Sequence, residues 1–306
     1  MHGWGGHART WAPIADALQP GHRVIAADLR GHGGSPAPMA GYRPVDLAGD
    51  LVALLDRLDA GPVVAVGHSM GAQVVTAMAV EHPEHVSALV VVDPAYGADA
   101  AEERLFGKRL AALRSKGAAA AVRQLGTLPA EVRAQLLATP GHVLAACYEG
   151  MYLGPDAFGA RPATRRYLAR RTRPVLCVRS LSEPAAWESS IPAPSGSQMV
   201  TWDGTGHFLH LERPQAFRPP SPLAGHPAPA RPRPRVAPGL TRPRRHCRSR
   251  AKSARSYACR FSGSASATGS RLQPGQGSTH PQHDLNIPAP MVGVTFRTEK
   301  TEKGDT

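Results

Sequence analysis

Residues 67–71 read Gly-His-Ser-Met-Gly, and the apolar run Pro-Val-Val-Ala-Val comes directly before them. Such a run favours a buried strand, and the residues that follow favour a helix over 72–81. A serine on a sharp strand-to-helix turn exposes its hydroxyl, while Gly67 and Gly71 avoid collisions as the chain doubles back. The first N–H groups of the helix would face any negative charge that forms near Ser69. The pattern predicts a serine nucleophile.

A serine hydroxyl is a poor nucleophile at neutral pH and needs an adjacent base. The chain has 14 histidines, and His207 is the best candidate because it ends the loop Asp-Gly-Thr-Gly-His after a predicted strand. It also follows the serine in the chain order that this kind of turn implies. His210 is the main competitor, but its apolar neighbours favour packing. We expect His68, inside the turn, to be packed as well.

Two further segments support this prediction. Residues 2–6 read His-Gly-Trp-Gly-Gly, and residues 28–35 read Asp-Leu-Arg-Gly-His-Gly-Gly-Ser. Taken in order with residues 67–71 and 202–208, they resemble the α/β-hydrolase family over residues 1–217. The resemblance implies a serine hydrolase, and it says little about the substrate, since this fold hosts many chemistries. The sequence holds no His-Glu-x-x-His motif, no phosphate-binding loop and no calcium loop, so we expect no cofactor and no metal.

The resemblance also implies an acid that orients His207. In the family this acid commonly follows a late strand, which makes Glu183 our preferred candidate, since glutamate can accept a hydrogen bond from imidazole. Asp93, at the end of the run Val-Val-Val-Asp-Pro, is the rival, and Glu188 is a third possibility. The backbone N–H groups of Trp4 and Met70 are the implied donors to a developing oxyanion.

Alternating strand and helix patterns over residues 10–95 predict an α/β fold, with a mostly parallel sheet and helices on both faces. The strands are expected at 23–28, 62–66, 88–92, 174–179 and 198–202, and further helices at 10–18 and 45–58. Residues 1–97 and 173–217 then form the hydrolase core. Residues 98–172, with helices expected at 100–116, 118–126 and 130–138, form a helical cap over the site.

The cap offers apolar side chains that could line a substrate pocket. The candidates are Phe106, Tyr148, Met151, Tyr152 and Phe158, although each could equally pack the cap onto the core. A capped site of this kind predicts hydrolysis of a small, largely apolar ester or lactone. Hydrolysis of a carbon–carbon bond in a diketone is the alternative reaction, and an inactive product of a mis-annotated or decayed gene is the alternative without activity.

The two ends of the chain are atypical for the family. Met1 leads almost directly into the glycine-rich loop, so the strand that should feed Gly3 is not in the sequence, and we expect a start upstream or a damaged sheet. The formal charge of +13 belongs mostly to the tail, since residues 219–306 carry a net +11 and residues 1–218 a net +2. Rich in Pro and Arg, residues 218–306 are predicted to be disordered.

The composition argues against several other classes of protein. Because the basic charge is confined to the tail, nucleic-acid binding is an unfavoured alternative. The four cysteines show no metal-binding or disulfide spacing. No run of 18 apolar residues suggests a membrane span. We therefore expect a cytoplasmic enzyme with a small-molecule substrate, and the sequence leaves the oligomeric state open.

Overall fold

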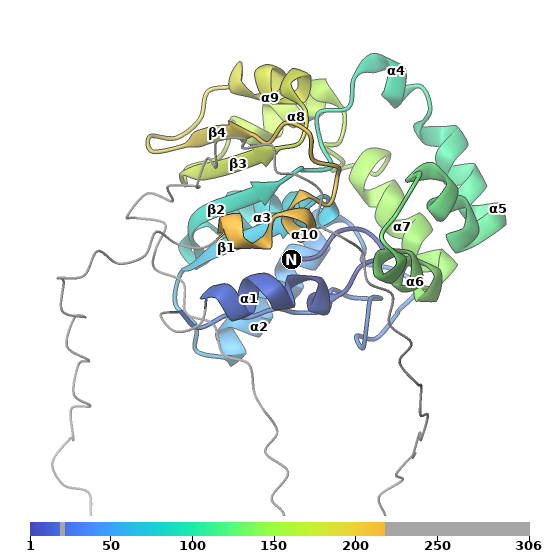
Figure 1. Cartoon of the computed structure of the whole chain (residues 1–306), viewed down its shortest axis with the longest axis horizontal. Coiled ribbons are helices and arrows are strands. Elements are labelled where there is room, and N and C mark those ends of the chain that lie inside the picture. Colours follow the sequence, from blue (N-terminus) through green and yellow to red (C-terminus); the bar gives the residue numbers. More distant parts are fainter. Residues whose placement is uncertain (19–21, 218–306) are drawn as a thin grey trace, which may run out of the picture. The chain divides into compact units, whose positions relative to one another are not determined.

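Four parallel strands form a single sheet in the residues that the computed structural model describes, 1–18 and 22–217 (Figure 1). They lie side by side in chain order: β1 (Val63–His68), β2 (Val86–Val92), β3 (Val175–Arg179) and β4 (Gln198–Thr201). Neighbouring parallel strands require crossover connections, which helices usually supply. All four strands therefore end at the same edge of the sheet.

Helices fill the connections, as the sequence predicted for an α/β fold. The described residues form η1 (Ala8–Trp11), α1 (Ala12–Leu18), α2 (Pro44–Arg57), α3 (Met70–Glu81), η2 (Pro83–His85), α4 (Ala100–Glu103), α5 (Phe106–Gln124), α6 (Ala130–Ala138), α7 (Gly141–Tyr152), α8 (Arg161–Leu168), α9 (Ser182–Ser189), α10 (Leu209–Glu212) and η3 (Pro214–Phe217). The helical insertion between β2 and β3 holds α4 to α8, of which α7 and α8 had no predicted bounds.

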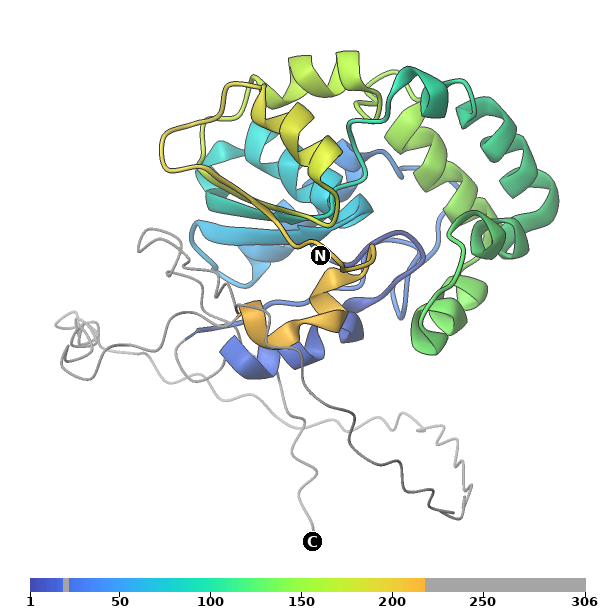
Figure 2. The same cartoon turned by 45° about the horizontal axis from the view of Figure 1, so that its top comes forward.

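Both faces of the sheet are covered, as Figure 2 shows. Ala65, Leu89 and Cys177 point to the face covered by α2 and α3. Side chains one position along, such as Val90, point to the opposite face and pack against Trp11 of η1. Because successive side chains alternate between faces, strands buried on both sides need apolar residues throughout. This explains the uninterrupted apolar runs in the sequence.

One predicted strand is not formed. Residues 22–29 have no regular secondary structure, although the sequence pattern favoured a strand at 23–28. A strand needs a hydrogen-bonded neighbour, and β1 is paired with β2 on one side only. On its other side β1 contacts Met1, which accepts a hydrogen bond from the N–H of His68 (3.0 Å). The segment 23–28 therefore has no strand beside it to pair with.

The predicted disordered tail, 218–306, lies outside the described residues. Among the helices that are described, none combines the length and the apolar character needed to cross a membrane.

Candidate active site

Ser69 sits on a strained turn between β1 and α3. Its backbone has φ 53° and ψ −116°, a left-handed conformation that residues with a side chain rarely adopt. Such strain persists only where the surroundings enforce it, and it is often found at functional sites. Here the Ser69 N–H donates to the Val92 carbonyl (3.0 Å), and the Ser69 carbonyl accepts from Ala72 (3.0 Å) and Ala95 (3.1 Å).

The two flanking glycines leave no room for a side chain, as the sequence predicted. A Cβ on Gly67 would lie 2.3 Å from the Gly71 carbonyl oxygen. A Cβ on Gly71 would lie 2.5 Å from the carbonyl oxygens of Met1 and His2. The turn therefore depends on glycine at both positions, since these neighbours are backbone atoms that cannot rotate away.

His207 contacts Asp93. The two side chains meet at 2.7 Å between Nδ1 of His207 and Oδ2 of Asp93. A carboxylate accepts hydrogen bonds, so Nδ1 carries the proton, and in the neutral ring Nε2 is left as an acceptor. The imidazole is 38% exposed, whereas the Asp93 side chain is 15% exposed. The arrangement leaves a basic nitrogen that a ligand could approach.

Further hydrogen bonds hold Asp93 in place. Its Oδ1 accepts from the Ser180 N–H and its Oδ2 from the Ser180 hydroxyl, both at 3.0 Å. Burial by itself would raise the pKa of Asp93, but the hydrogen bond and charge of His207, together with the Ser180 N–H and the Arg179 charge, outweigh it and lower that pKa. Asp93 is therefore a carboxylate at neutral pH.

Ser69 and His207 are held at the same edge of the sheet. The Ser69 N–H bonds the residue directly before Asp93, and Asp93 bonds His207. On the other side, Nε2 of His68 donates to the His207 carbonyl oxygen (2.8 Å). Within the described residues no hydrogen bond joins the Ser69 hydroxyl to the His207 ring.

Buried histidines pack behind His207. The ring of His68 lies 4.7 Å from that of His207 and 4.3 Å from that of His210, between ring centres, and His210 stacks on Trp11 at 4.8 Å. Their exposed fractions are 2% for His68 and 1% for His210, which confirms the predicted packing. Burial lowers the pKa of His68 well below its ordinary value and that of His210 to about 3. Both rings are therefore neutral near pH 7.

The structure does not bring Glu183, our preferred acid, to His207. Glu183 lies in the first turn of α9, its side chain is 70% exposed, and it pairs with Arg161 at 2.5 Å. Glu188 is buried in an ion pair with Arg179 (2.7 Å). The sequence preference failed because α9 begins at Ser182, directly after β3, and turns Glu183 towards solvent. The signal for Asp93 was its place after β2, the strand next to β1.

The candidate oxyanion donors belong to α3 and to the loop at residues 2–6. Met70 is the first residue of α3, so the helix itself cannot supply an acceptor for its N–H. Trp4 lies in the loop at residues 2–6, where a Cβ on Gly3 would lie 3.2 Å from Cβ of Ser69. The ring of His2 anchors this loop, accepting from the Leu29 N–H (3.0 Å) and donating to the Gly3 carbonyl (2.9 Å).

Three of the five candidate lining residues gather beside Trp4. The ring centre of Tyr148 is 5.9 Å from that of Trp4 and 4.9 Å from that of Tyr152, and Phe106 lies 4.5 Å from Tyr152. The indole N–H of Trp4 also donates to the Leu144 carbonyl of α7 (3.0 Å). The insertion therefore contacts the loop next to Ser69.

The other two candidates pack elsewhere. Phe158 stacks on Tyr167, with ring centres 4.0 Å apart, in a cluster with Tyr96 and Leu168. Met151 lies in the core cluster that also holds Leu47 and Leu51 of α2. For these two side chains the structure shows packing of the insertion onto the core.

Known proteins share this fold and parts of this sequence. Residues 1–169 match the alpha/beta hydrolase fold family. The putative carbamate hydrolase RutD of Variovorax paradoxus is 42% identical over 117 residues, 38% of this chain and 44% of that protein. The lipase LipV of Mycobacterium tuberculosis is 40% identical over 104 residues, 34% of this chain and 39% of that protein. The aligned part of this chain thus spans less than half the length of either relative.

Among solved structures, an enol-lactonase of Burkholderia xenovorans LB400 superimposes with a TM-score of 0.60 at 22% identity, over 71% of this chain and 86% of the other. At that identity the likeness concerns the fold. The family match, which covers more than half of the sequence, shows that the chain belongs to the alpha/beta hydrolase fold family.

Proposed function

We propose that this protein is a serine hydrolase that cleaves small, largely apolar esters or lactones through Ser69, His207 and Asp93. The observation that carries the proposal is the 2.7 Å contact between Nδ1 of His207 and Asp93. It fixes the tautomer in which Nε2 can take a proton. The strained serine turn beside it supplies the hydroxyl that would lose that proton.

In the proposed reaction, the Ser69 oxygen attacks the carbonyl carbon of the substrate while Nε2 of His207 takes the hydroxyl proton. The electron pair of the C=O bond moves to oxygen, which the N–H groups of Met70 and Trp4 stabilise. Collapse of this intermediate expels the alcohol, which receives the proton from His207. Water then attacks the acyl-enzyme by the same route, releasing the acid and restoring Ser69.

The substrate class rests on the side chains beside the loop. Trp4, Phe106, Tyr148 and Tyr152 form an aromatic wall, which favours an apolar acyl or alcohol group. We also propose that residues 98–172 act as a cap that excludes water. The names of two relatives, the putative carbamate hydrolase RutD and the lipase LipV, support hydrolysis as the class of reaction.

Turnover of p-nitrophenyl acetate and of a short γ-lactone tests the proposal. The Ser69→Ala variant should lose nearly all activity and keep the melting temperature of the parent. Ser87→Ala, at an exposed position of β2, is the matched control and should retain activity. A folded parent protein that turns over neither substrate, or a Ser69→Ala variant that still does, would contradict the proposal.

A further inference from the structure

Ser180 follows β3 directly and is held between the ends of two neighbouring strands. The Asp93 N–H, after β2, donates to the Val178 carbonyl of β3 (2.8 Å). On the other side, the Trp202 N–H, after β4, donates to the Arg179 carbonyl (2.8 Å). Ser180 is buried between these contacts. It therefore has a fixed place beside the carboxylate of Asp93.

Ser180 gives both of its hydrogen-bond donors to Asp93. Its N–H donates to Oδ1 and its hydroxyl to Oδ2, both at 3.0 Å. The same Oδ2 accepts from Nδ1 of His207 at 2.7 Å. Donors on both carboxylate oxygens limit the rotation of this group about its Cβ–Cγ bond. Ser180 thus holds Oδ2 towards the imidazole ring.

The backbone of Asp93 is also held from β3. Its φ is 41°, a left-handed conformation that residues with a side chain rarely adopt and that persists where the surroundings enforce it. The Arg179 guanidinium donates to the Pro94 carbonyl (3.3 Å), and a buried ion pair with Glu188 (2.7 Å) fixes this arginine in turn. Two successive residues at the end of β3, Arg179 and Ser180, therefore hold the turn and the carboxylate of an acid that β2 supplies.

We propose that Ser180 is a positioning residue for the reaction of Ser69 and His207 and acts through Asp93; this inference rests on the proposed function. Its hydroxyl holds Oδ2 of Asp93 against Nδ1 of His207. By stabilising the negative charge on that oxygen, the hydroxyl also weakens the attraction of the carboxylate for a charged imidazole ring. A ring that already carries two protons cannot take the proton of Ser69. Ser180 thus keeps His207 neutral, and able to act as a base, down to lower pH.

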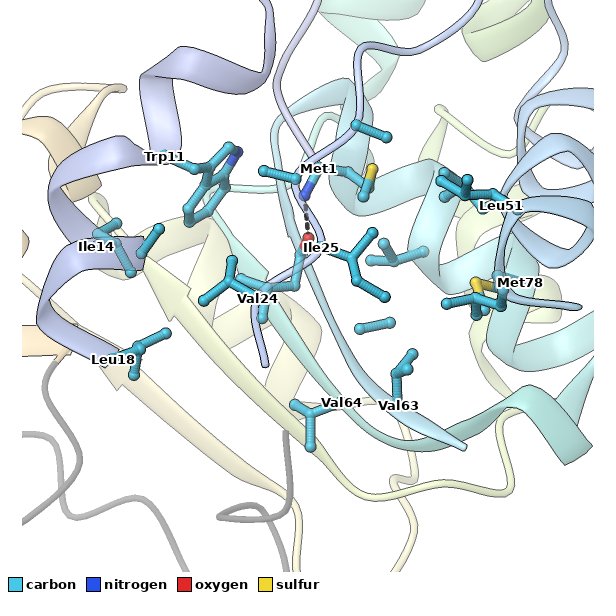
Figure 3. Close-up of a pocket in the computed structure, with 18 residues that line it drawn as sticks. Met1, Trp11, Ile14, Leu18, Val24, Ile25, Leu51, Val63, Val64 and Met78 are labelled. Atoms are coloured by element: carbon cyan, nitrogen blue, oxygen red, sulfur yellow. Dashed lines mark hydrogen bonds between the residues drawn. The ribbon is translucent and has the colours of Figure 1, made fainter. Parts of the chain in front are cut away.

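The other titratable groups around the pair of His207 and Asp93 come from several elements. Within the described residues they include His68 of β1, Arg179 of β3 with Glu188 of α9, His210 and Glu212 of α10, and the Met1 amino group. The Met1 amino group lies at an apolar pocket whose lining side chains carry no titratable group (Figure 3). Replacing Ser180 leaves all of these groups unchanged. A change in the titration of His207 therefore reports on the hydrogen bond between Ser180 and Asp93.

Ser180→Ala tests the proposal, because it removes the hydroxyl and keeps the N–H that bonds Oδ1 of Asp93. Ser180→Thr keeps a hydroxyl on the same carbon, and Ser182→Ala, at an exposed site in α9, is the matched control. Proton NMR of the imidazole rings gives the pH at which half of His207 is protonated, and the loss of its signal in His207→Ala identifies it. The pH dependence of kcat/KM for p-nitrophenyl acetate is the second measurement, and the melting temperature shows whether each variant is folded.

In Ser180→Ala, the midpoint of the His207 titration and the acid limb of kcat/KM should both move to higher pH by about 0.5 unit or more, a roughly threefold or larger change in proton affinity. Ser180→Thr and Ser182→Ala should both stay close to the parent. A His207 titration in Ser180→Ala that coincides with that of the parent would overturn the proposal, whatever the melting temperature, and so would an equal shift in Ser180→Thr or Ser182→Ala. A parent protein without ester turnover would contradict the proposed function instead, and the NMR titration would still decide whether Ser180 controls the His207 ring.

Discussion

Replacing Asp93 by asparagine tests the proposed triad at its most specific contact. The Ser180 N–H needs an acceptor at the Oδ1 position of Asp93, so the asparagine oxygen would lie there and the amide NH2 would face His207. An NH2 group donates, so Nδ1 of His207 would have to accept. The imidazole proton would then move to Nε2. In that tautomer Nε2 cannot take the proton of Ser69.

The expected loss follows from the tautomer. With the ring in place but wrongly protonated, kcat for p-nitrophenyl acetate should fall by about 10³–10⁴-fold, equivalent to about 4–5.5 kcal/mol in the activation barrier. KM should change little, because Asp93 is buried behind His207 and does not face the substrate. The melting temperature should stay close to that of the parent, since asparagine keeps the volume and the Ser180 N–H bond.

Glu183→Gln is the matched control. Its exposed side chain pairs with Arg161 and not with His207, and exposed ion pairs contribute little to stability. We therefore expect kcat and the melting temperature to stay close to those of the parent. The reasoning would be refuted if Glu183→Gln lost activity as severely as expected for Asp93→Asn while Asp93→Asn remained active.

Three further predictions concern the turn and its surroundings. Ser69→Gly should abolish ester turnover yet be more stable than Ser69→Ala by about 1 kcal/mol, measured by urea unfolding, because glycine relieves the positive φ; equal stability would argue against strain. Gly71→Ala should lower the free energy of unfolding by about 2 kcal/mol or more, because the new Cβ would overlap the Met1 carbonyl. Gly49→Ala on α2 is the control: no atom lies near its Cβ, so it should raise the free energy of unfolding by up to about 1 kcal/mol. Burial lowers the pKa of His210 to about 3 in the folded protein, whereas it is near 6.5 in the unfolded chain. The contribution of the neutral ring to the free energy of unfolding is therefore fully present above about pH 6.5. It falls as the pH drops towards 3, by about 2 kcal/mol at pH 5. His210→Phe should weaken this dependence.

Short patterns in the sequence predicted most of the fold. The glycine-flanked serine after an apolar run predicted the β1 to α3 turn, because local packing and backbone geometry decide that conformation. Burial of both faces of β2 and β3 was also predictable, because their residues form continuous apolar runs in the sequence. The strand expected at 23–28 was predicted wrongly. A strand forms only with a hydrogen-bonded neighbour, and an apolar run in the sequence does not reveal whether that neighbour exists.

The acid beside His207 could not be predicted from the sequence either, because its identity depends on the folded sheet. Glu183 and Asp93 both follow predicted strands, so chain position alone did not separate them. Their distances from His207 depend on strand order and on where α9 begins, and both are properties of the folded sheet. The positions of the aromatic candidates also depend on the folded insertion. Tyr148 contacts Trp4 in the loop at residues 2–6, whereas Phe158, from the same insertion, packs on Tyr167.

Covalent labelling of Ser69 tests the central claim most directly. An alkyl fluorophosphonate reacts with a serine only when an adjacent base activates it. Intact-mass and peptide analysis should find one adduct per chain, located on Ser69, formed rapidly in the parent and far more slowly in His207→Ala. A parent protein that turns over esters but carries no adduct at Ser69, or that is labelled equally fast without His207, would contradict the account.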